Sequence, residues 1–342
     1  MNQFNKPAVS VTEQISILKN RGLAIQFPER AERYLEVISY FRLSAYMRPF
    51  QKNINEQVVD HQFKDGTEFK QIVDLYAFDR ELRLLIMDAI ERVEVAIRAT
   101  LNNVMANKHQ TDDICSGSHW YLNKSLFKSS YQHKRLLKEI EDKQSKEFND
   151  LQRDVKKIER TSAAAEIKVR RIERRVRENY ARFYQHTYDS PQLMPGWAMV
   201  EELTLGSISH LYRGLARDSD RKDIARRFDL PQEVLESWLH TLNFVRNCCA
   251  HHSRLWNREL SVQPKIPNGD NWQMPDRLEP SQVQPKRRIY MVLLMLGHLM
   301  RQVSPDSQWH KKVKALVTLH PEIPMFPMGL PDDWLTHEFF IS

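Results

Sequence analysis

The sequence predicts an all-α fold, and three observations support this prediction. Apolar residues recur at intervals of three and four along most of the chain, no convincing alternation of apolar and polar residues indicates a strand, and only nine of the 342 residues are glycine. Glycine is needed where a backbone turns closely around phosphates, and neither G-x-G-x-x-G nor G-x-x-x-x-G-K-[ST] occurs. We therefore expect a helical protein without a nucleotide-binding loop, and we expect no cofactor.

The composition is that of an ordinary globular protein with one large or two modest domains. Hydrophobic residues make up 41% of the chain and charged residues 28%. The three cysteines are Cys115 and the adjacent pair Cys248 and Cys249, which argues against disulfides and for a reducing compartment. Residues 1–10 lack the apolar core of a signal peptide, and the longest apolar run, 289–297, is far shorter than the roughly 20 residues of a membrane span. We expect a cytoplasmic protein with no membrane partner.

Two short helices and one long helix are predicted in the N-terminal part. Apolar spacing predicts a helix over 13–22 and a second helix over 31–41, whose aromatic residues we expect in the core. A polar segment over 51–67 indicates a loop or a small hairpin. The long amphipathic helix is predicted over 68–107, with its apolar stripe in the core. The remaining surface of this helix is expected to carry Asp79, Arg80, Arg83, Glu91, Glu94 and Arg98.

The segment over 134–178 differs from the rest of the chain in its charge. It holds 15 Lys/Arg against 10 Asp/Glu and therefore carries +5 of the net charge of +7. Apolar residues over 148–176, Val169 among them, follow the heptad spacing of a coiled coil, and small residues interrupt the pattern over 161–165. The segment is therefore one long helix or a helical hairpin.

The most basic face of this segment is either solvated surface or a site for an anion, with RNA as the leading candidate. Two arginines of the long helix, Arg80 and Arg83, are weaker candidates for contacts with RNA phosphates. The residues of the basic face are Lys168, Arg170, Arg171, Arg174, Arg175 and Arg177.

The C-terminal half is expected to contain further helices separated by loops. The predicted elements are, in order, a loop over 180–195, a helix or broken pair over 197–215, a basic helix over 222–228, a helix over about 232–256 that Asp229 caps, a loop over 257–285, an apolar helix over 287–303 and an irregular tail from Pro321.

The end of the helix predicted over 232–256 carries the densest polar cluster of the chain. Asn247, His251, Arg254 and Arg258 follow at intervals of four, three and four, which places them on one stripe of a helix. Two chemistries fit this cluster poorly. Two zinc ligands that converge on one ion are separated by two to five intervening residues. Adjacent cysteines or histidines on a helix instead point about 100° apart and do not converge. A cysteine–histidine nucleophile pair has no orienting third group at the usual spacing. Core histidines remain the plainest alternative.

Ribonuclease chemistry fits the cluster better. Internal cleavage of RNA needs a base to remove the proton of the 2′-OH and a cation to stabilise the extra charge on the phosphate. His251 and Arg246 supply these two groups, and Asn247 is placed one turn away to orient the imidazole. Histidine suits this role as a residue type because its reference pKa is about 6.5.

The cluster also resembles a known family. The string Arg-Asn-x-x-Ala-His, which begins at Arg246, is similar to the R-x4-6-H motif of HEPN ribonucleases, and residues 246–257 resemble the Abi-like (AbiD/AbiF-type) abortive infection family. Several linked motifs in the same order are more specific than one motif alone. The other matching segments are Lys6-Pro7, 40–46 with Pro49-Phe50, 75–85, 90–98 and 195–212 with Trp197, Glu201 and Gly206.

The resemblance implies an all-helical HEPN domain, a toxin-like role in phage defence, and metal-independent cleavage that leaves a 2′,3′-cyclic phosphate and a 5′-OH. It assigns catalysis to Arg246, Asn247 and His251, with His252 and Arg254 in support. It also implies RNA as the partner, including a structured noncoding RNA. A non-catalytic module that holds such an RNA or a partner protein is the alternative. A modification enzyme is a third option, which no nucleotide motif supports.

The spacing of the motif predicts a homodimer. Arg246 and His251 lie about 140° apart around an ideal helix, so one chain does not place them on one stripe. HEPN enzymes pair two such motifs across an interface, and this sequence holds one arginine, Arg246, at five to seven residues before a histidine. Two chains would then share one symmetric RNA groove. We expect an N-terminal helical part over 1–123, a basic coiled-coil insertion over 124–182 and a C-terminal helical part over 183–342.

Overall fold

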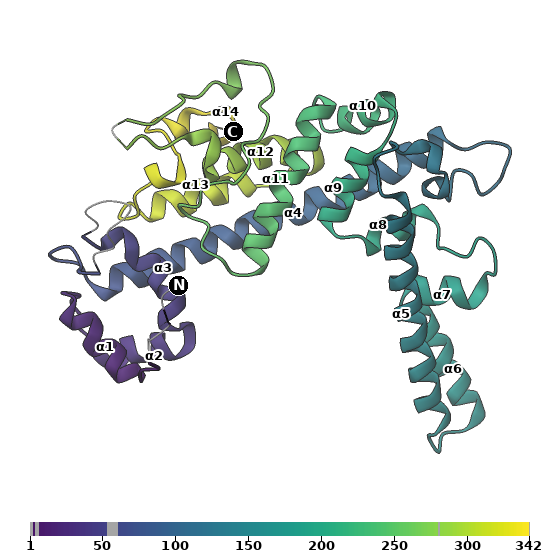
Figure 1. Cartoon of the computed structure of the whole chain (residues 1–342), viewed down its shortest axis with the longest axis horizontal. Helices are drawn as coiled ribbons and strands as arrows, with labels where there is room; N and C mark the ends of the chain where they lie inside the picture. The colour runs from purple at the N-terminus through teal and green to yellow at the C-terminus, as the bar shows by residue number, and fades with distance from the viewer. Residues whose placement is uncertain (1–2, 4–6, 53–60, 280, 342) are drawn as a thin grey trace.

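The computed structural model describes residues 3, 7–52, 61–279 and 281–341, and it consists of helices joined by loops (Figure 1). These residues contain isolated β-bridges and no β-strand. The all-α prediction is therefore confirmed. Lys6 and part of the segment predicted as a loop or hairpin, namely 53–60 of 51–67, lie outside the described residues.

The helices are named by their order along the chain. The α-helices are α1 Val11–Asn20, α2 Pro28–Ile38, α3 Tyr40–Met47, α4 Phe69–Lys108, α5 His133–Glu159, α6 Ala165–Arg177, α7 Tyr180–Thr187, α8 Gly196–Glu202, α9 Leu205–Gly214, α10 Asp218–Arg226, α11 Gln232–Ala250, α12 Ile289–Val303, α13 Trp309–Leu319 and α14 Glu338–Ile341. The 3₁₀ helices are η1 Arg48–Phe50, η2 Trp120–Leu122, η3 Lys124–Leu126, η4 Asp270–Trp272, η5 Pro285–Arg287, η6 Phe326–Met328 and η7 Trp334–Thr336.

Helix α4 is the axis of the molecule (Figure 1). Its 40 residues give a length of about 60 Å at 1.5 Å per residue. Helices α3, α8, α10, α11, α12 and α13 pack against it, and α12 is buried nearly all round, as expected for a helix without a polar face. The core therefore runs along α4. Its buried apolar residues are Ile72, Leu75, Phe78, Leu82, Ile86, Ala89, Ile90, Val93, Ile97, Leu101 and Met105.

The helix predicted over 31–41 is two helices, α2 and α3. Ser39 separates them with a φ of 77°, and its hydroxyl accepts a hydrogen bond from the Arg42 amide at 3.3 Å. The change of direction buries Tyr46, whose ring meets that of Tyr76 edge to face at 5.4 Å. It also leaves Phe41 87% exposed, so the expectation that the aromatic residues of this segment lie in the core is wrong for Phe41.

The charged segment forms a hairpin of α5 and α6, which projects from the body at the far end of α4 (Figure 1). Of the two shapes that the sequence left open, the hairpin is the one observed. Val169, expected in the seam, is 54% exposed, whereas Leu151 on α5 and Val176, seven residues after Val169 on α6, are buried. Lys168 instead closes the turn, because its ammonium donates to the Glu159 carbonyl at 2.8 Å.

The segment predicted as a loop over 180–195 begins with a helix, α7. The Asn179 side chain caps it by accepting hydrogen bonds from the amides of Ala181 and Arg182 at 2.8 and 3.3 Å. Arg182 then pairs with Glu147 on α5 at 2.8 Å. Helix α7 has only eight residues and buries only Ala181 and Tyr184, which is too short a pattern for a search by apolar periodicity and explains the wrong prediction.

The elements after α7 follow the sequence prediction with several differences, one of which is that the tail expected to be irregular from Pro321 contains the short helix α14. The pair α8 and α9 is broken as expected, and α10 begins at Asp218 rather than at 222. Asp229 adopts a φ of 51° and does not cap α11, since Pro231 occupies the N-cap position. Helix α11 ends at Ala250, six residues before the predicted end. Helix α13 was not predicted at all.

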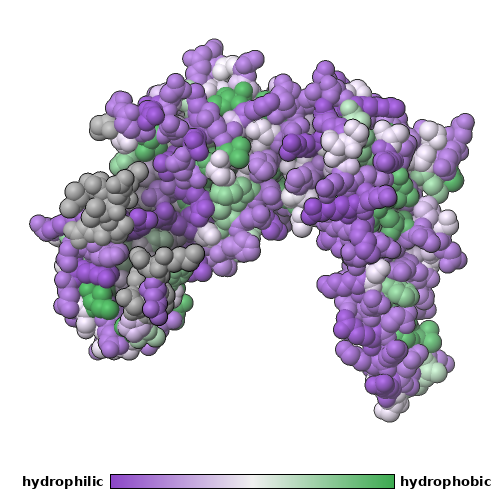
Figure 2. All heavy atoms as spheres, in the orientation of Figure 1, coloured by the Kyte–Doolittle hydropathy of each residue, from purple (hydrophilic) through white to green (hydrophobic). Residues whose placement is uncertain are grey.

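The molecule has the shape of an arch (Figure 1). Helices α1 to α3 descend at one end of α4, and the hairpin of α5 and α6 descends at the other. Hydrophilic residues cover most of the hairpin surface in the view of Figure 2. Within the described residues, no helix combines the length and apolar character that a membrane crossing requires.

Candidate functional site

The R-x4-H motif lies at the C-terminal end of α11. The helix ends in a Schellman motif, in which the Ser253 amide donates to the Cys248 carbonyl at 2.8 Å and the His252 amide to the Cys249 carbonyl at 3.0 Å. His251 is the C-cap, and His252 takes the next position with a φ of 54°. Glycine is usual at that position because a left-handed backbone crowds a Cβ atom.

The end of α11 presents the predicted catalytic side chains on the surface. Asn247 and His251 are exposed, and Arg246 is half-buried. Among the described residues, no side chain forms a hydrogen bond or ion pair with that of Arg246 or His251. The motif is therefore open to a ligand, whereas the opposite face of α11 is buried against α9, α4 and α10.

The polar stripe predicted from Asn247 to Arg258 does not exist as one helical face. Because α11 ends at Ala250, Arg254 lies in the following loop, where it donates to the Ala45 carbonyl of α3 at 2.5 Å. A second contact joins the same elements, since Arg42 of α3 donates to the His252 carbonyl at 2.6 Å. Helix α3 therefore holds the loop that follows the motif at two points.

A buried carboxylate, Asp79, fixes the rest of this loop. Its oxygens accept hydrogen bonds from the Leu255 amide at 3.1 Å, the Trp256 amide at 2.6 Å and the Tyr46 hydroxyl at 2.6 Å. Arg83 completes the set with an ion pair at 2.5 Å. Burial raises the pKa of Asp79, and the charge of Arg83 and the three hydrogen bonds oppose this by stabilising the carboxylate. One carboxylate thus joins α3, α4 and the loop from His251 to Trp256, which we call the motif loop.

The sequence prediction placed Asp79 and Arg83 on the surface, and this is wrong. The Asp79 side chain is fully buried and that of Arg83 is 6% exposed. The guanidinium of Arg83 donates hydrogen bonds to Asp79 and Tyr46. Arg83 is therefore not exposed for a contact with RNA, contrary to the sequence prediction. Arg80, on the other hand, is exposed. The i,i+4 spacing of Asp79 and Arg83 was the one available signal for the buried pair.

The two adjacent cysteines lie on the buried side of α11, away from the histidines. Cys248 and Cys249 are 7% and 4% exposed, whereas His251 and His252 are exposed. Burial raises the pKa of the Cys249 thiol to about 12, and it also raises that of Cys248. A thiol in this state stays protonated at neutral pH, which makes it a packing residue rather than a nucleophile.

The basic face of the hairpin is only partly free. Lys168 is bound to the Glu159 carbonyl, and Arg175 pairs with Glu178 at 2.7 Å. Arg174 lies 3.8 Å from the same carboxylate. The remaining arginines, Arg170, Arg171 and Arg177, have no ion-pair partner within the described part of the chain. The structure therefore keeps the motif on α11 and these arginines on separate elements, at the body and on the hairpin.

The fold and the site together define an all-helical protein with an R-x4-H motif at an exposed helix end. A family model for Abi-like proteins matches residues 33–257, well over half of the chain, and the chain belongs to this family. The match begins in α2, runs through the hairpin and ends directly after the motif loop. Membership implies a role in abortive infection, a form of defence against phage. No curated protein and no solved structure matches the chain.

Proposed function

We propose that the protein is a cytoplasmic, toxin-like endoribonuclease of the HEPN type, which cleaves RNA in abortive infection without a metal ion. The observation that carries this proposal is the joint placement of Arg246, Asn247 and His251 at the exposed end of α11. Within the described part of the chain these three side chains have no hydrogen-bond or ion-pair partner, so an RNA phosphate and its ribose can reach them.

The chemistry assigns one role to each group. His251 removes the proton of the 2′-OH, and the 2′-oxygen attacks the adjacent phosphorus. Arg246 stabilises the additional negative charge of the pentacovalent phosphate, and Asn247 orients the imidazole. The bond to the 5′-oxygen breaks, and that oxygen takes up a proton, so the products carry a 2′,3′-cyclic phosphate and a 5′-OH.

The test compares three variants of residues on the same helix. Purified protein should cleave single-stranded RNA in the presence of EDTA, and His251→Ala and Arg246→Ala should each lower the rate about 10²- to 10⁴-fold. His240→Ala is the matched control, because His240 is also exposed on α11, and this variant should keep the rate. Unchanged cleavage by both motif variants would refute the assignment.

The proposed active species is a homodimer that brings two motifs together. Support comes from the wide angle between Arg246 and His251 on one helix and from the single motif in each chain. Phe41 supplies a further argument, because this 87% exposed aromatic residue precedes Arg42, which contacts the motif loop. A single-chain molar mass in solution for cleavage-active protein would contradict the dimer.

The alternative is a non-catalytic module that holds a structured noncoding RNA or a partner protein. The observation that favours it is the set of arginines Arg170, Arg171 and Arg177, which lie on the projecting hairpin rather than beside the motif. Such a module would bind RNA tightly and leave it intact under every condition. Recovery of intact bound RNA after long incubation at neutral pH would therefore support this alternative over the nuclease.

A further inference from the structure

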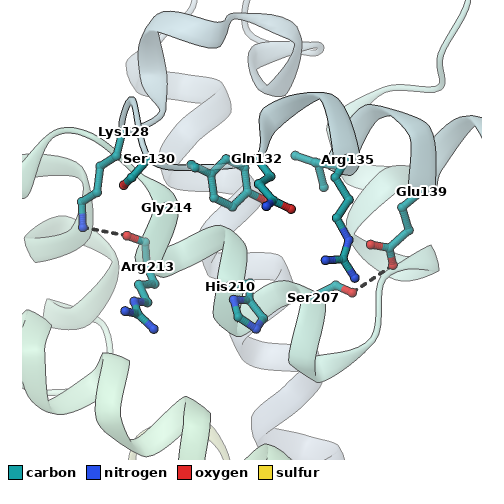
Figure 3. Close-up of a pocket in the computed structure, with 11 residues that line it drawn as sticks. Lys128, Ser130, Gln132, Arg135, Glu139, Ser207, His210, Arg213 and Gly214 are labelled. Carbon is teal, nitrogen blue, oxygen red and sulfur yellow. Dashed lines mark hydrogen bonds between the residues drawn. The ribbon is translucent and has the colours of Figure 1, made fainter.

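A pocket of about 620 Å³ lies where the hairpin joins the body, between α9 and the start of α5. Four basic side chains line it, namely those of Lys128, Arg135, His210 and Arg213. Figure 3 shows them spread in a row across the pocket, with His210 between the two arginines. Three cationic side chains spread in a row, with an imidazole among them, match a chain of successive phosphates better than they match one small ion.

The frame of the pocket is held firmly. Lys128 is joined to α9 through its amide, which donates to the Gly214 carbonyl at 2.8 Å, and through its ammonium, which donates to the Arg213 carbonyl at 2.7 Å. The Tyr131 ring stacks on Phe127 at 5.0 Å and lies so close to Gly214 that a Cβ atom there would meet it at 2.3 Å. The cations are therefore mounted on a fixed scaffold rather than on a loose loop.

The charge balance inside the pocket favours an anion. Glu139 is the one carboxylate in its wall and accepts a hydrogen bond from the Ser207 hydroxyl at 2.9 Å, and Glu236 outside the wall lies 3.6 Å from Arg213, so the three cations Lys128, Arg135 and Arg213 face two carboxylates. Burial, and next the charge of Arg221, lower the pKa of Lys128. A negative charge beside this ammonium would offset the repulsion between the cations.

The pocket and the motif lie along one pair of helices. Helix α9 packs along α11, with Arg213 3.6 Å from Glu236 at one end and Gly206 against the Asn243 side chain at the other. From Asn243 the same face of α11 continues with steps of four residues through Asn247 to His251. These eight residues cover about 12 Å of helix, so the pocket is within a few nucleotides of the motif.

We propose that this pocket binds phosphates of single-stranded RNA a few nucleotides away from the phosphate that is cleaved at the R-x4-H motif. The inference rests on the proposed function, because it places the pocket on the path of the substrate. The pocket recognises backbone charge, not base sequence, and it fixes how the RNA is aligned relative to His251.

The test measures RNA binding and cleavage for matched pairs of variants. R135Q/R213Q removes two pocket cations, and K222Q/R227Q removes two exposed cations at the neighbouring helix α10 as the control. In an H251A background, which keeps the RNA intact, the affinity for a short single-stranded RNA should fall about tenfold in R135Q/R213Q. The slope of log affinity against log salt should decrease by roughly 1.4, because each lost phosphate contact contributes about 0.7. The control should change affinity less than twofold.

The outcomes separate this proposal from the proposed function. Wild-type protein that binds RNA through the pocket but never cleaves it would refute the nuclease and leave the pocket supported. Wild-type protein that cleaves RNA, with the same affinity and salt slope in R135Q/R213Q as in the control, would overturn the pocket. A change of molar mass in R135Q/R213Q with unchanged RNA affinity would also overturn it and would identify the pocket as a contact between protein chains.

Discussion

At the scale of single residues, the position of the motif depends on groups that take no part in the proposed chemistry. Asp79 accepts hydrogen bonds from two backbone amides of the loop that follows α11. Arg254 and Arg42 join the same loop to α3. A displacement of this loop would move His251, which is its first residue. We therefore regard Asp79 as a positioning residue that acts through the backbone of the loop.

Asp79→Asn should destabilise the protein strongly. The substitution leaves Arg83 buried without a charged partner, which costs about 3–5 kcal/mol of the free energy of unfolding. Asp74→Asn is the matched control, because Asp74 pairs with Lys70 on the same helix at its surface and contributes about 1 kcal/mol or less. Urea unfolding of both variants checks this. Equal losses in the two variants would show that the Asp79 network does not hold the loop.

His252→Gly should keep activity and preserve or raise stability. The residue has a φ of 54° at a position that favours glycine, so removing its side chain relieves about 1 kcal/mol of backbone strain. The carbonyl that binds Arg42 remains. The free energy of unfolding and the RNA cleavage rate are the two measurements. A fully folded variant that no longer cleaves RNA would assign the proton transfer to His252 instead of His251.

At the scale of elements, apolar spacing predicted the main helices and failed where polar contacts decide the structure. The stripe of α4 was predicted correctly, but Asp79 and Arg83 were assigned to the surface, because apolar spacing does not report a buried ion pair. Helix α7 was missed because it is only eight residues long and buries only Ala181 and Tyr184, beside the ion pair of Arg182 with Glu147. The position of the end of α11 was also unpredictable from spacing, since a positive φ at His252 and contacts from α3 terminate the helix.

The candidate site shows the same division. Arg246, Asn247 and His251 were predicted from the motif, and the structure places them at one exposed helix end. The pocket between α5 and α9 could not be predicted, because its basic residues come from positions 128, 135, 210 and 213, which share no local pattern. Only the fold brings these residues together. The hairpin residues were found from charge alone, which does not reveal that Lys168 is bound to a carbonyl.

The hairpin should contribute to RNA binding through one stripe of α6. Arg170, Arg174 and Arg177 follow at intervals of four and three, which places them on one face of the helix. Their replacement by Gln should weaken RNA binding and lower the slope of log affinity against log salt by roughly 2. Stability should change by less than about 0.5 kcal/mol, because these side chains are exposed. Titration of RNA at several salt concentrations measures the slope.

The matched control for this stripe lies on the other helix of the hairpin. Arg153, Lys156 and Lys157 are exposed on α5, and their replacement by Gln removes the same charge from the same projection. Equal effects of the two triple variants would show that the hairpin acts through its overall charge and not through the α6 stripe.

At the scale of the whole molecule, the protein is an arch whose axis is helix α4 (Figure 1). Helix α4 carries the body on which α11 presents the motif, and the hairpin projects from its far end (Figure 1). The pocket at the base of the hairpin lies between these two parts. The segment 134–178, which includes the hairpin, holds +5 of the net charge of +7, so most of the net positive charge lies on this projection.

The proposed removal of the 2′-OH proton by His251 is tested most directly with an RNA substrate in which one sugar is altered. The assay uses a short RNA in which the nucleotide before the cleaved bond carries a 2′-deoxy sugar, in parallel with the unmodified RNA. We expect that both RNAs bind with similar affinity and that only the unmodified RNA is cleaved, to a 2′,3′-cyclic phosphate and a 5′-OH. Cleavage of the 2′-deoxy substrate at the same bond would contradict it.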